Sequence, residues 1–192
     1  MRELIYYVAC SVDGFIAHPD DSHAGFLLEG EHITDLAASF PETFPAHFRD
    51  ILGIDSENQR FDAVLMGRKT YEVGLKVGIS NPYPHLKQYL FSHSLKESSN
   101  PNIERVSGEA VTFVKDLKHE RGKGIWLCGG ATLASTLFAE SLIDQLILKV
   151  NPFLMGAGIP LFAHAIPQTA LELINHKIYK NGVLVLHYQV EP

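Results

Sequence analysis

The sequence predicts an α/β fold with a mostly parallel central sheet, helices on both faces (three layers) and an antiparallel hairpin at the C-terminal edge. Short apolar runs without alternation, such as residues 4–11 and 125–128, are typical of strands covered on both faces. These runs alternate with helical patterns, which favours parallel strands joined by helices. Near the C-terminus, Asn181-Gly182 separates two strand-like runs, and this dipeptide is the strongest short hairpin signal. It predicts a two-residue turn in which both residues have a positive φ. The 192 residues suit one domain with a single core.

In the first half of the chain, strands are expected where apolar runs rich in strand formers end in turn residues such as Asp13-Gly14. Helices are expected where apolar residues recur every three or four positions, until a stop such as Pro41. In chain order, these rules predict a strand at residues 4–11, a loop to residue 25, helices at 31–40 and 44–52, a strand at 63–66 and a helical turn at 71–73.

The second half of the chain follows the same rules. Glycine and proline predict loops at residues 74–84 and 153–162. The helix at residues 110–119 is amphipathic, with Ala110, Phe113, Val114 and Leu117 toward the sheet. The remaining elements are strands at residues 88–91, 103–106, 125–128, 144–150, 171–179 and 183–190, and a helix at 131–139.

Composition and charge indicate an ordinary soluble globular protein. Hydrophobic residues make up 46% of the chain and charged residues 20%. The formal charge of −6 argues against a nucleic-acid or anionic-membrane partner, and no apolar stretch is long enough to span a bilayer. Cys10 and Cys128 each lie in an apolar run, so we expect buried free thiols in a reducing compartment, the cytoplasm. The histidines lack metal-ligand spacing, and no metal site is expected.

A glycine pair follows the strand at residues 125–128 and is the central motif of the chain. Gly129-Gly130 joins this strand to a helix, so the unpaired N–H groups of the helix start lie at the carboxyl edge of the sheet. Such an arrangement binds phosphate, because the helix dipole and the free donors both favour an anion. A second interpretation is a strand–helix corner in which glycine serves only close packing. The sequence alone leaves both interpretations open.

Three loops are expected to meet at this edge, because ligands of such sheets bind beyond the carboxyl ends of the strands. Gly67-Arg68-Lys69-Thr70 supplies two cations and a hydroxyl, Ser92-His93 supplies two hydrogen-bonding side chains, and residues 129–132 supply backbone donors. Each of these residues also has an ordinary structural explanation. Thr70 is suited to capping a helix, Arg68 and Lys69 are suited to a solvent-exposed surface, and Ser92 is suited to a turn. Together, with no carboxylate beside them, they predict a phosphate-rich cofactor. The GxGxxG fingerprint of an ordinary Rossmann site is absent.

Four segments carry a resemblance to a known family. They resemble the successive motifs of the dihydrofolate reductase fold, in the same order and at comparable spacing. The segments are ACSVDGFIA (residues 9–17), MGRKTYE (66–72), LFSHS (90–94) and IWLCGGATL (125–133). The chain resembles the RibD C-terminal family, the reductase domain of bacterial riboflavin biosynthesis, more closely, because Ser11-Val12-Asp13-Gly14 and residues 142–162 also match. The resemblance covers nearly the whole chain and implies one dihydrofolate reductase-like domain.

The resemblance implies an NADPH site built from the three loops. Ala9 and Ile16 would border the nicotinamide, and Ser92 and His93 would lie near the adenosine 2′-phosphate. The residues implied to hold the phosphates are Gly67, Arg68, Lys69 and Thr70, with Gly129, Gly130, Ala131, Thr132 and Leu133 around the pyrophosphate. A cis peptide between the two glycines and a homodimer through the edge strands are further family expectations.

The substrate side matches the family less well. Dihydrofolate reductase has one acidic residue on its first helix that helps to protonate the pterin. Here Glu29, Glu31 and Asp35 fall in the corresponding stretch, none of them in a recognisable motif. The catalytic candidates are Asp13, which lies in the matching family motif, Glu31 and Asp35. Asp13 also suits a purely structural role in the turn at Gly14. A small-molecule substrate is the expected partner. The leading function is an NADPH-dependent reductase of 5-amino-6-(5-phosphoribosylamino)uracil, and the alternatives are a pteridine reductase and a non-catalytic nucleotide- or flavin-binding protein.

Overall fold

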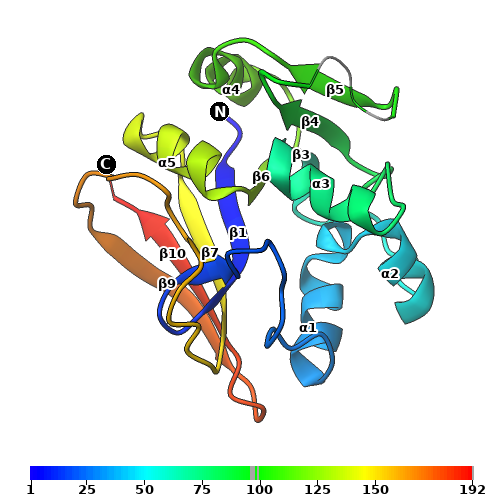
Figure 1. The fold of residues 1–192 in the computed structure, drawn as a ribbon, viewed down its shortest axis with the longest axis vertical. Helices are drawn as coiled ribbons and strands as arrows, with labels where there is room; N and C mark the ends of the chain where they lie inside the picture. The colour runs from blue at the N-terminus through cyan, green and yellow to red at the C-terminus, as the bar shows by residue number, and fades with distance from the viewer. Residues whose placement is uncertain (96–97, 99, 192) are drawn as a thin grey trace.

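The computed structural model describes residues 1–95, 98 and 100–191 (Figure 1). Apolar runs form its strands and amphipathic segments form most of its helices. The strands are β1 (Leu4–Ser11), β2 (Phe15–Ala17), β3 (Phe61–Gly67), β4 (Lys87–Phe91), β5 (Ile103–Val106), β6 (Gly124–Gly129), β7 (Gln145–Asn151), β8 (Ile159–Pro160), β9 (Leu171–Ile178) and β10 (Leu184–Val190). The helices are α1 (Glu31–Ser39), α2 (Ala46–Leu52), α3 (Arg68–Lys76), α4 (Ala110–His119) and α5 (Ala131–Ala139), with a 3₁₀ turn η1 (Pro41–Thr43).

The main sheet has eight strands within the described residues, in the order β5-β4-β3-β6-β1-β7-β10-β9. The strands from β5 to β7 pair in parallel. β10 pairs antiparallel with both β7 and β9, so the antiparallel strands form one edge of the sheet. The predicted fold class, a mostly parallel sheet with an antiparallel C-terminal hairpin, is confirmed.

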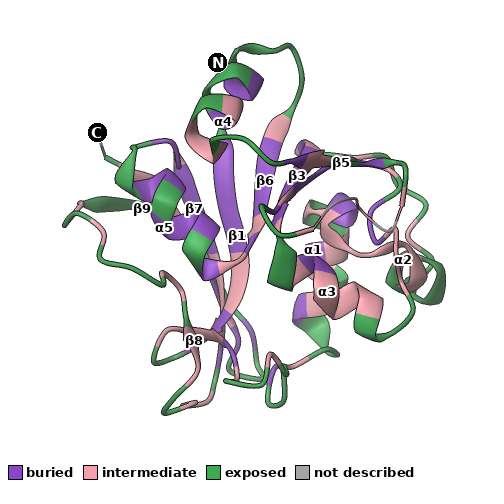
Figure 2. Ribbon diagram, turned by 45° about the horizontal axis from the view of Figure 1, so that its top comes forward, coloured by how far each residue is buried: buried purple, intermediate pink, exposed green. Residues whose placement is uncertain are grey.

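Helices cover both faces of the sheet, as its two hydrophobic cores show. On one face, Leu4 of β1 packs in the same core as Val114 of α4 and residues of α5. On the other face, Ile5 packs in a core with Leu36 of α1 and Tyr71 of α3. Consecutive residues of β1 therefore point to opposite faces, as its uninterrupted apolar sequence requires. Figure 2 shows the central strands buried and β9 exposed at the sheet edge.

The differences from the predicted elements are local. Only a helical turn is predicted at residues 71–73, whereas α3 runs from Arg68 to Lys76 with Tyr71 buried on its inner side. This helix replaces the first residues of the loop predicted at 74–84. Strands β2 and β8 pair antiparallel with each other. No period-2 pattern predicts them, because strands of three and two residues are too short to show one.

The hairpin between β9 and β10 lies where it is predicted, but its turn type differs. The Tyr179 N–H donates to the Val183 carbonyl at 3.0 Å, and the Gly182 N–H donates to the Tyr179 carbonyl at 2.9 Å. The loop is therefore three residues long, and of its members only Gly182 has a positive φ, 86°. The prediction of a two-residue turn with positive φ at both Asn181 and Gly182 is wrong. A three-residue loop needs just one left-handed residue, which glycine provides without steric cost.

Candidate functional site

A cavity of about 1220 Å³ opens where the carboxyl ends of the parallel strands meet α1, α2, α3 and α5. This is the location that a mostly parallel sheet dictates for a ligand. Every residue expected at the cofactor site lines the cavity. These residues are Ala9, Ile16, Gly67, Arg68, Lys69, Thr70, Ser92, His93, Gly129, Gly130, Ala131, Thr132 and Leu133. The tertiary structure thus brings together loops that are up to 124 residues apart in the chain (Ala9 and Leu133).

The glycine pair presents bare backbone to this cavity. The Gly129-Gly130 peptide is cis, as the family resemblance implies, and α5 begins directly after it. The first helical bond is donated by the Ala134 N–H to the Gly130 carbonyl at 3.0 Å, so the N–H groups of residues 131–133 have no acceptor within the helix. These donors lie at the positive end of the helix dipole, where an anion is stabilised.

Gly130 distinguishes the two interpretations of the glycine pair, phosphate binding and close packing. A Cβ built on Gly130 meets only Thr70 Oγ1, at an ordinary contact distance of 3.4 Å, and its backbone (φ −95°, ψ −172°) suits any residue. Packing therefore does not require glycine there. Close packing belongs to Gly67 instead, where a Cβ would lie 3.2 Å from the Gly130 nitrogen. The cradle at Gly130 fits a phosphate group, because a side chain would fill the space that such a group needs.

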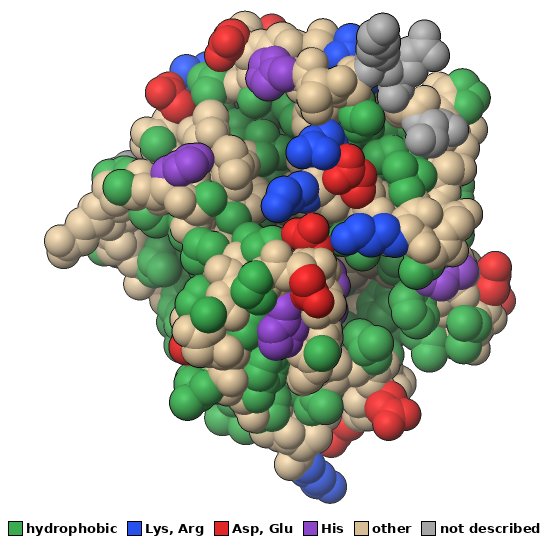
Figure 3. Space-filling model, in the orientation of Figure 1, with side chains coloured by type: hydrophobic (Ala, Val, Ile, Leu, Met, Phe, Trp, Pro, Cys, Tyr) green, Lys and Arg blue, Asp and Glu red, His purple; other side chains and the backbone are tan. Residues whose placement is uncertain are grey.

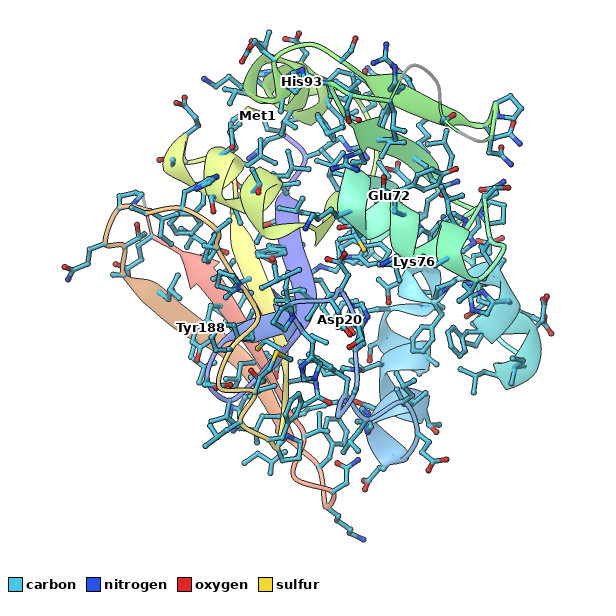
Figure 4. The ribbon with its side chains drawn as sticks, viewed as in Figure 1. Met1, Asp20, Glu72, Lys76, His93 and Tyr188 are labelled. Atoms are coloured by element: carbon cyan, nitrogen blue, oxygen red, sulfur yellow. The ribbon has the colours of Figure 1, made fainter. Side chains whose placement is uncertain are left out.

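The cations of α3 are already paired with carboxylates, contrary to the expectation that none lies beside them. Arg68 pairs with Glu72 at 2.8 Å, because the i,i+4 spacing places both on one face of α3. Lys69 lies 3.7 Å from Asp21, a residue of the first loop that also lies 3.6 Å from Lys76. Figure 3 shows these charges gathered over α3, and Figure 4 shows Glu72 and Lys76 on α3 with Asp20 in the loop opposite. Such exposed pairs contribute roughly 0–1 kcal/mol, so a doubly charged phosphate can replace them.

Ser92 combines a structural role with its place at the cavity. Its side chain is 7% exposed, and its Oγ accepts a hydrogen bond from the Leu95 N–H at 3.1 Å. This bond is the turn role that residue type alone suggests. The next residue, His93, is exposed at the end of β4, beside α4 in Figure 4. His93 therefore has the freer side chain of the two for contact with a ligand.

None of the three acidic candidates lines the cavity. Asp13 accepts hydrogen bonds from the Met155 and Gly156 N–H groups, and these bonds, with one from Ser11, lower the pKa of its carboxyl to about 2. Asp35 binds Lys177 at 2.7 Å and the Tyr179 hydroxyl, both in the C-terminal hairpin, and both contacts lower its pKa. A proton donor needs a raised pKa, so neither residue suits that role.

Glu31 is the third acidic candidate, and it is exposed at the first position of α1. Its side chain adds a negative charge at the helix N-terminus, which stabilises the helix. The structure therefore places Asp13, Glu31 and Asp35 outside the lining of the cavity, and their catalytic role stays a prediction that these positions do not support. Loop geometry and helix orientation decide where these side chains lie, and neither can be deduced from local sequence.

Several cavity residues have no counterpart among the predicted site residues. Lys149 of β7, Tyr7 of β1 and Thr43 of η1 line the cavity, as do apolar residues of α1 and α2. Lys149 had a signal in the sequence, because it interrupts the apolar run LILKV within β7. The apolar residues of α1 and α2 had no such signal, because a helix that faces a cavity shows the same apolar periodicity as a helix that faces the hydrophobic core.

Other kinds of site find no support in the described part of the chain. Burial raises the pKa of the Cys128 thiol, which lines the cavity, to about 12, and that of Cys10 to about 11. Neither thiol is ionised at neutral pH, so neither acts as a nucleophile. Across these residues, His, Cys, Asp and Glu form no group of three or more that could hold a metal ion. No helix in this part of the chain has the length and apolar character needed to cross a membrane.

Comparison with known proteins identifies relatives along nearly the full chain. Residues 2–185 match the model of the RibD C-terminal domain. Protein YwjB of Bacillus subtilis (strain 168) is 32% identical over 187 residues, which cover 97% of both chains. Protein YyaP of the same organism is 28% identical over 198 residues, which cover 97% of this chain and 94% of YyaP.

Solved structures share the fold. A putative riboflavin biosynthesis protein from Shewanella sp. PV-4 superposes with a TM-score of 0.71 at 21% identity, with both chains fully covered. A pyrimidine reductase-like protein from Corynebacterium diphtheriae has a TM-score of 0.63 at 16% identity, covering all of this chain and 92% of the other. A deaminase/reductase from Thermotoga maritima has a TM-score of 0.63 at 12% identity, covering 99% of this chain and 57% of the other. The fold is that of the riboflavin-pathway reductases, and the chain belongs to the RibD C-terminal domain family.

Proposed function

We propose that this protein is an NADPH-dependent reductase of a small heterocyclic substrate. The observation that carries the proposal is the bare backbone at Gly130, beside the free N–H groups of α5 and the cations of α3. When bound, NADPH supplies a hydride for a C=N or C=O bond. We place the reaction in the cytoplasm, where Cys10 and Cys128 stay as the free thiols that the structure contains.

The residues of this chain bind and orient the reactants. The N–H groups of Ala131, Thr132 and Leu133 would hold the pyrophosphate, and Arg68 and Lys69 would hold further phosphate charge. Ala9 and Ile16 would pack on the nicotinamide and hold it in place for the transfer of the hydride. The apolar walls exclude water from the reacting atoms, which protects the hydride donor from side reactions.

An absorbance assay tests the proposed activity. NADPH oxidation is followed at 340 nm with two kinds of substrate. One is 5-amino-6-(5-phosphoribosylamino)uracil, the compound for which the structurally similar Thermotoga maritima reductase is named, and the other is a panel of pteridines. Turnover of either class supports a reductase. NADPH binding without oxidation of any substrate would favour a non-catalytic nucleotide-binding protein, and absence of NADPH binding would contradict the proposal.

Cofactor preference gives a quantitative test of the phosphate-binding residues. NADPH is expected to bind more tightly than NADH, because the 2′-phosphate adds charge near Arg68, Lys69, Ser92 and His93. Loss of one charge-assisted contact costs about 1.5–3 kcal/mol, so Arg68→Ala is expected to weaken NADPH binding about ten-fold or more. Fluorescence titration measures both affinities.

Arg121→Ala serves as the matched control for Arg68→Ala. Arg121 is exposed and does not line the cavity, so its removal is expected to leave NADPH affinity unchanged. Equal affinity of the wild type for NADH and NADPH would remove the 2′-phosphate assignment. An Arg68→Ala variant that loses NADPH and NADH equally would place Arg68 at the pyrophosphate instead.

We also propose that the protein forms a homodimer through β9. All eight residues of this edge strand are exposed, and they include Leu171, Leu173, Ile174 and Ile178. An edge strand with unpaired backbone groups and aliphatic side chains is suited to pairing with a second copy. Analytical ultracentrifugation is expected to give a dimer for the wild type and a monomer for Leu173→Glu. A monomeric wild type would contradict the proposal.

A further inference from the structure

Lys149 is a cation that lines the cavity without a carboxylate partner. No Asp or Glu of the described residues lies within 4.0 Å of its ammonium group. Its nearest acceptor is the Leu27 carbonyl, at 3.5 Å. His32 already donates to that carbonyl from Nε2 at 3.2 Å, because its Nδ1 accepts from Asn181. Lys149 therefore keeps donor capacity that the protein does not use.

The cross-strand neighbours of Lys149 are apolar, and this makes its unused charge costly. On either side, its strand neighbours are Ala9 of β1 and Val185 of β10. Burial lowers the pKa of its ammonium group. A partly buried ammonium without a partner favours any ligand group that can accept its hydrogen bonds.

Lys149 lies on a different side of the cavity from the phosphate-binding cations. Arg68 follows β3, whereas Lys149 lies on β7, and β6 and β1 intervene in the sheet. Three strand spacings separate β3 from β7, a distance of roughly 14 Å. Of the lysines and arginines whose positions the structure describes, only Arg68, Lys69 and Lys149 line the cavity. Lys149 is therefore the cation available to a substrate rather than to the cofactor phosphates.

The wall next to Lys149 is hydrophobic and partly aromatic. We call it the apolar wall, and it comprises Leu28, Ile33, Leu36, Phe44, Phe48 and Trp126. The Lys149 ammonium lies 3.5 Å from the carbonyl of Leu27, the residue that precedes Leu28 of the apolar wall. Flat aromatic molecules gain most from such a surface. A phosphomonoester, with two negative charges, requires more donors than one ammonium offers.

We propose, resting on the reductase function above, that the substrate is a flat, unphosphorylated aromatic or heteroaromatic molecule with one anionic group held by Lys149. The apolar wall holds its ring, and the ammonium holds its carboxylate or ring enolate. Lys149 thereby discriminates against neutral analogues and against sugar phosphates. This assignment selects between the two substrate classes, since Lys149 is the single lysine or arginine that the described residues place on this side of the cavity.

Calorimetric titration with three probes tests the assignment. The probes are naphthalene-2-carboxylate, the neutral naphthalene-2-carboxamide and ribose 5-phosphate, each titrated with and without saturating NADPH. The wild type is expected to bind the carboxylate at least ten-fold more tightly than the amide, and ribose 5-phosphate most weakly. Lys149→Met should bind carboxylate and amide equally, whereas Lys149→Arg should keep the preference. Lys180→Met, at the exposed tip of the hairpin, is the matched control and should behave as the wild type.

Two results would overturn the assignment: an unchanged carboxylate preference in a folded Lys149→Met protein, or tighter binding of ribose 5-phosphate than of the carboxylate by the wild type. Thermal melting checks folding, and Lys149→Gln gives a second neutral variant if Lys149→Met melts early. NADPH titration keeps this test separate from the proposed function, because Lys149→Met is expected to bind NADPH as the wild type does. A wild type that binds no NADPH but prefers the carboxylate would remove the reductase proposal and leave the Lys149 site standing.

Discussion

Replacing Gly130 by valine is expected to lower NADPH affinity by ~100-fold or more while the protein remains folded, a loss of about 2.7 kcal/mol in binding. The Cβ at this position projects into the cavity, where it meets only Thr70 Oγ1 at 3.4 Å. The side chain would therefore occupy the space proposed for the pyrophosphate, and the donors at the start of α5 could no longer be reached. NADPH titration and thermal melting on the same purified variant measure both effects.

Gly67→Ala provides the contrast to Gly130→Val. Its Cβ would lie 3.2 Å from the Gly130 nitrogen and 3.7 Å from the Gly129 carbonyl oxygen, so backbone must move to accept it. We expect Gly67→Ala to lower the melting temperature. Its NADPH affinity should fall only to the extent that the backbone at Gly129 and Gly130 shifts. A folded Gly130→Val protein with wild-type NADPH affinity would end the phosphate-cradle hypothesis. If Gly130→Val lowers the melting temperature and loses NADPH binding only in proportion to unfolding, Gly130 is a packing residue.

Glu42→Ala is expected to destabilise the fold by about 4 kcal/mol, because it leaves three backbone donors without an acceptor. The Glu42 side chain belongs to a residue that is 0% exposed. Its carboxylate accepts hydrogen bonds from the Arg60 and Phe61 N–H groups at 2.6 Å and from the Gln59 N–H at 3.1 Å. These bonds tie η1 to the start of β3, and η1 carries Thr43, which lines the cavity. Urea denaturation measures the free energy of unfolding.

Two variants define the Glu42 effect. Glu42→Gln keeps the oxygen that serves Arg60 and Phe61 and loses only the acceptor for Gln59, so it is expected to cost about half as much. Glu57→Ala, at an exposed position nearby, is expected to change stability by less than about 0.5 kcal/mol. A loss below about 1 kcal/mol for Glu42→Ala would show that water or a local shift satisfies the three donors.

Local sequence determined the elements of this fold because each element has a local physical cause. Apolar runs predicted β1, β3, β6 and β7, and helical periodicity with a glycine before it predicted α5 with its observed bounds. Turn residues located the C-terminal hairpin. The turn type was wrong, because the flanking Tyr179 and Val183 close a three-residue loop that the Asn-Gly dipeptide does not specify.

That the loops proposed to bind the cofactor meet at one cavity was predictable for a related reason. Its residues follow strands directly, and the carboxyl ends of parallel strands lie at one edge, so sequence order already brings Gly67, Ser92 and Gly129 together. The carboxylate partners of Arg68 and Lys69 were not predicted. Asp21 approaches Lys69 across a loop, and the length of that loop does not reveal where it folds.

The tertiary structure alone decided the substrate side. Asp35 is suitable as an acid by residue type and helix position, yet its partner Lys177 lies 142 residues away on the hairpin that flanks β7. Lys149 reaches the cavity because the order of the strands places β7 next to β1, with Ala9 as its neighbour. Periodicity and turn chemistry act over a few residues, and they determined the elements and the loops that follow the parallel strands. Strand order and helix orientation follow from packing over the whole chain, so they decided which side chains a substrate would meet.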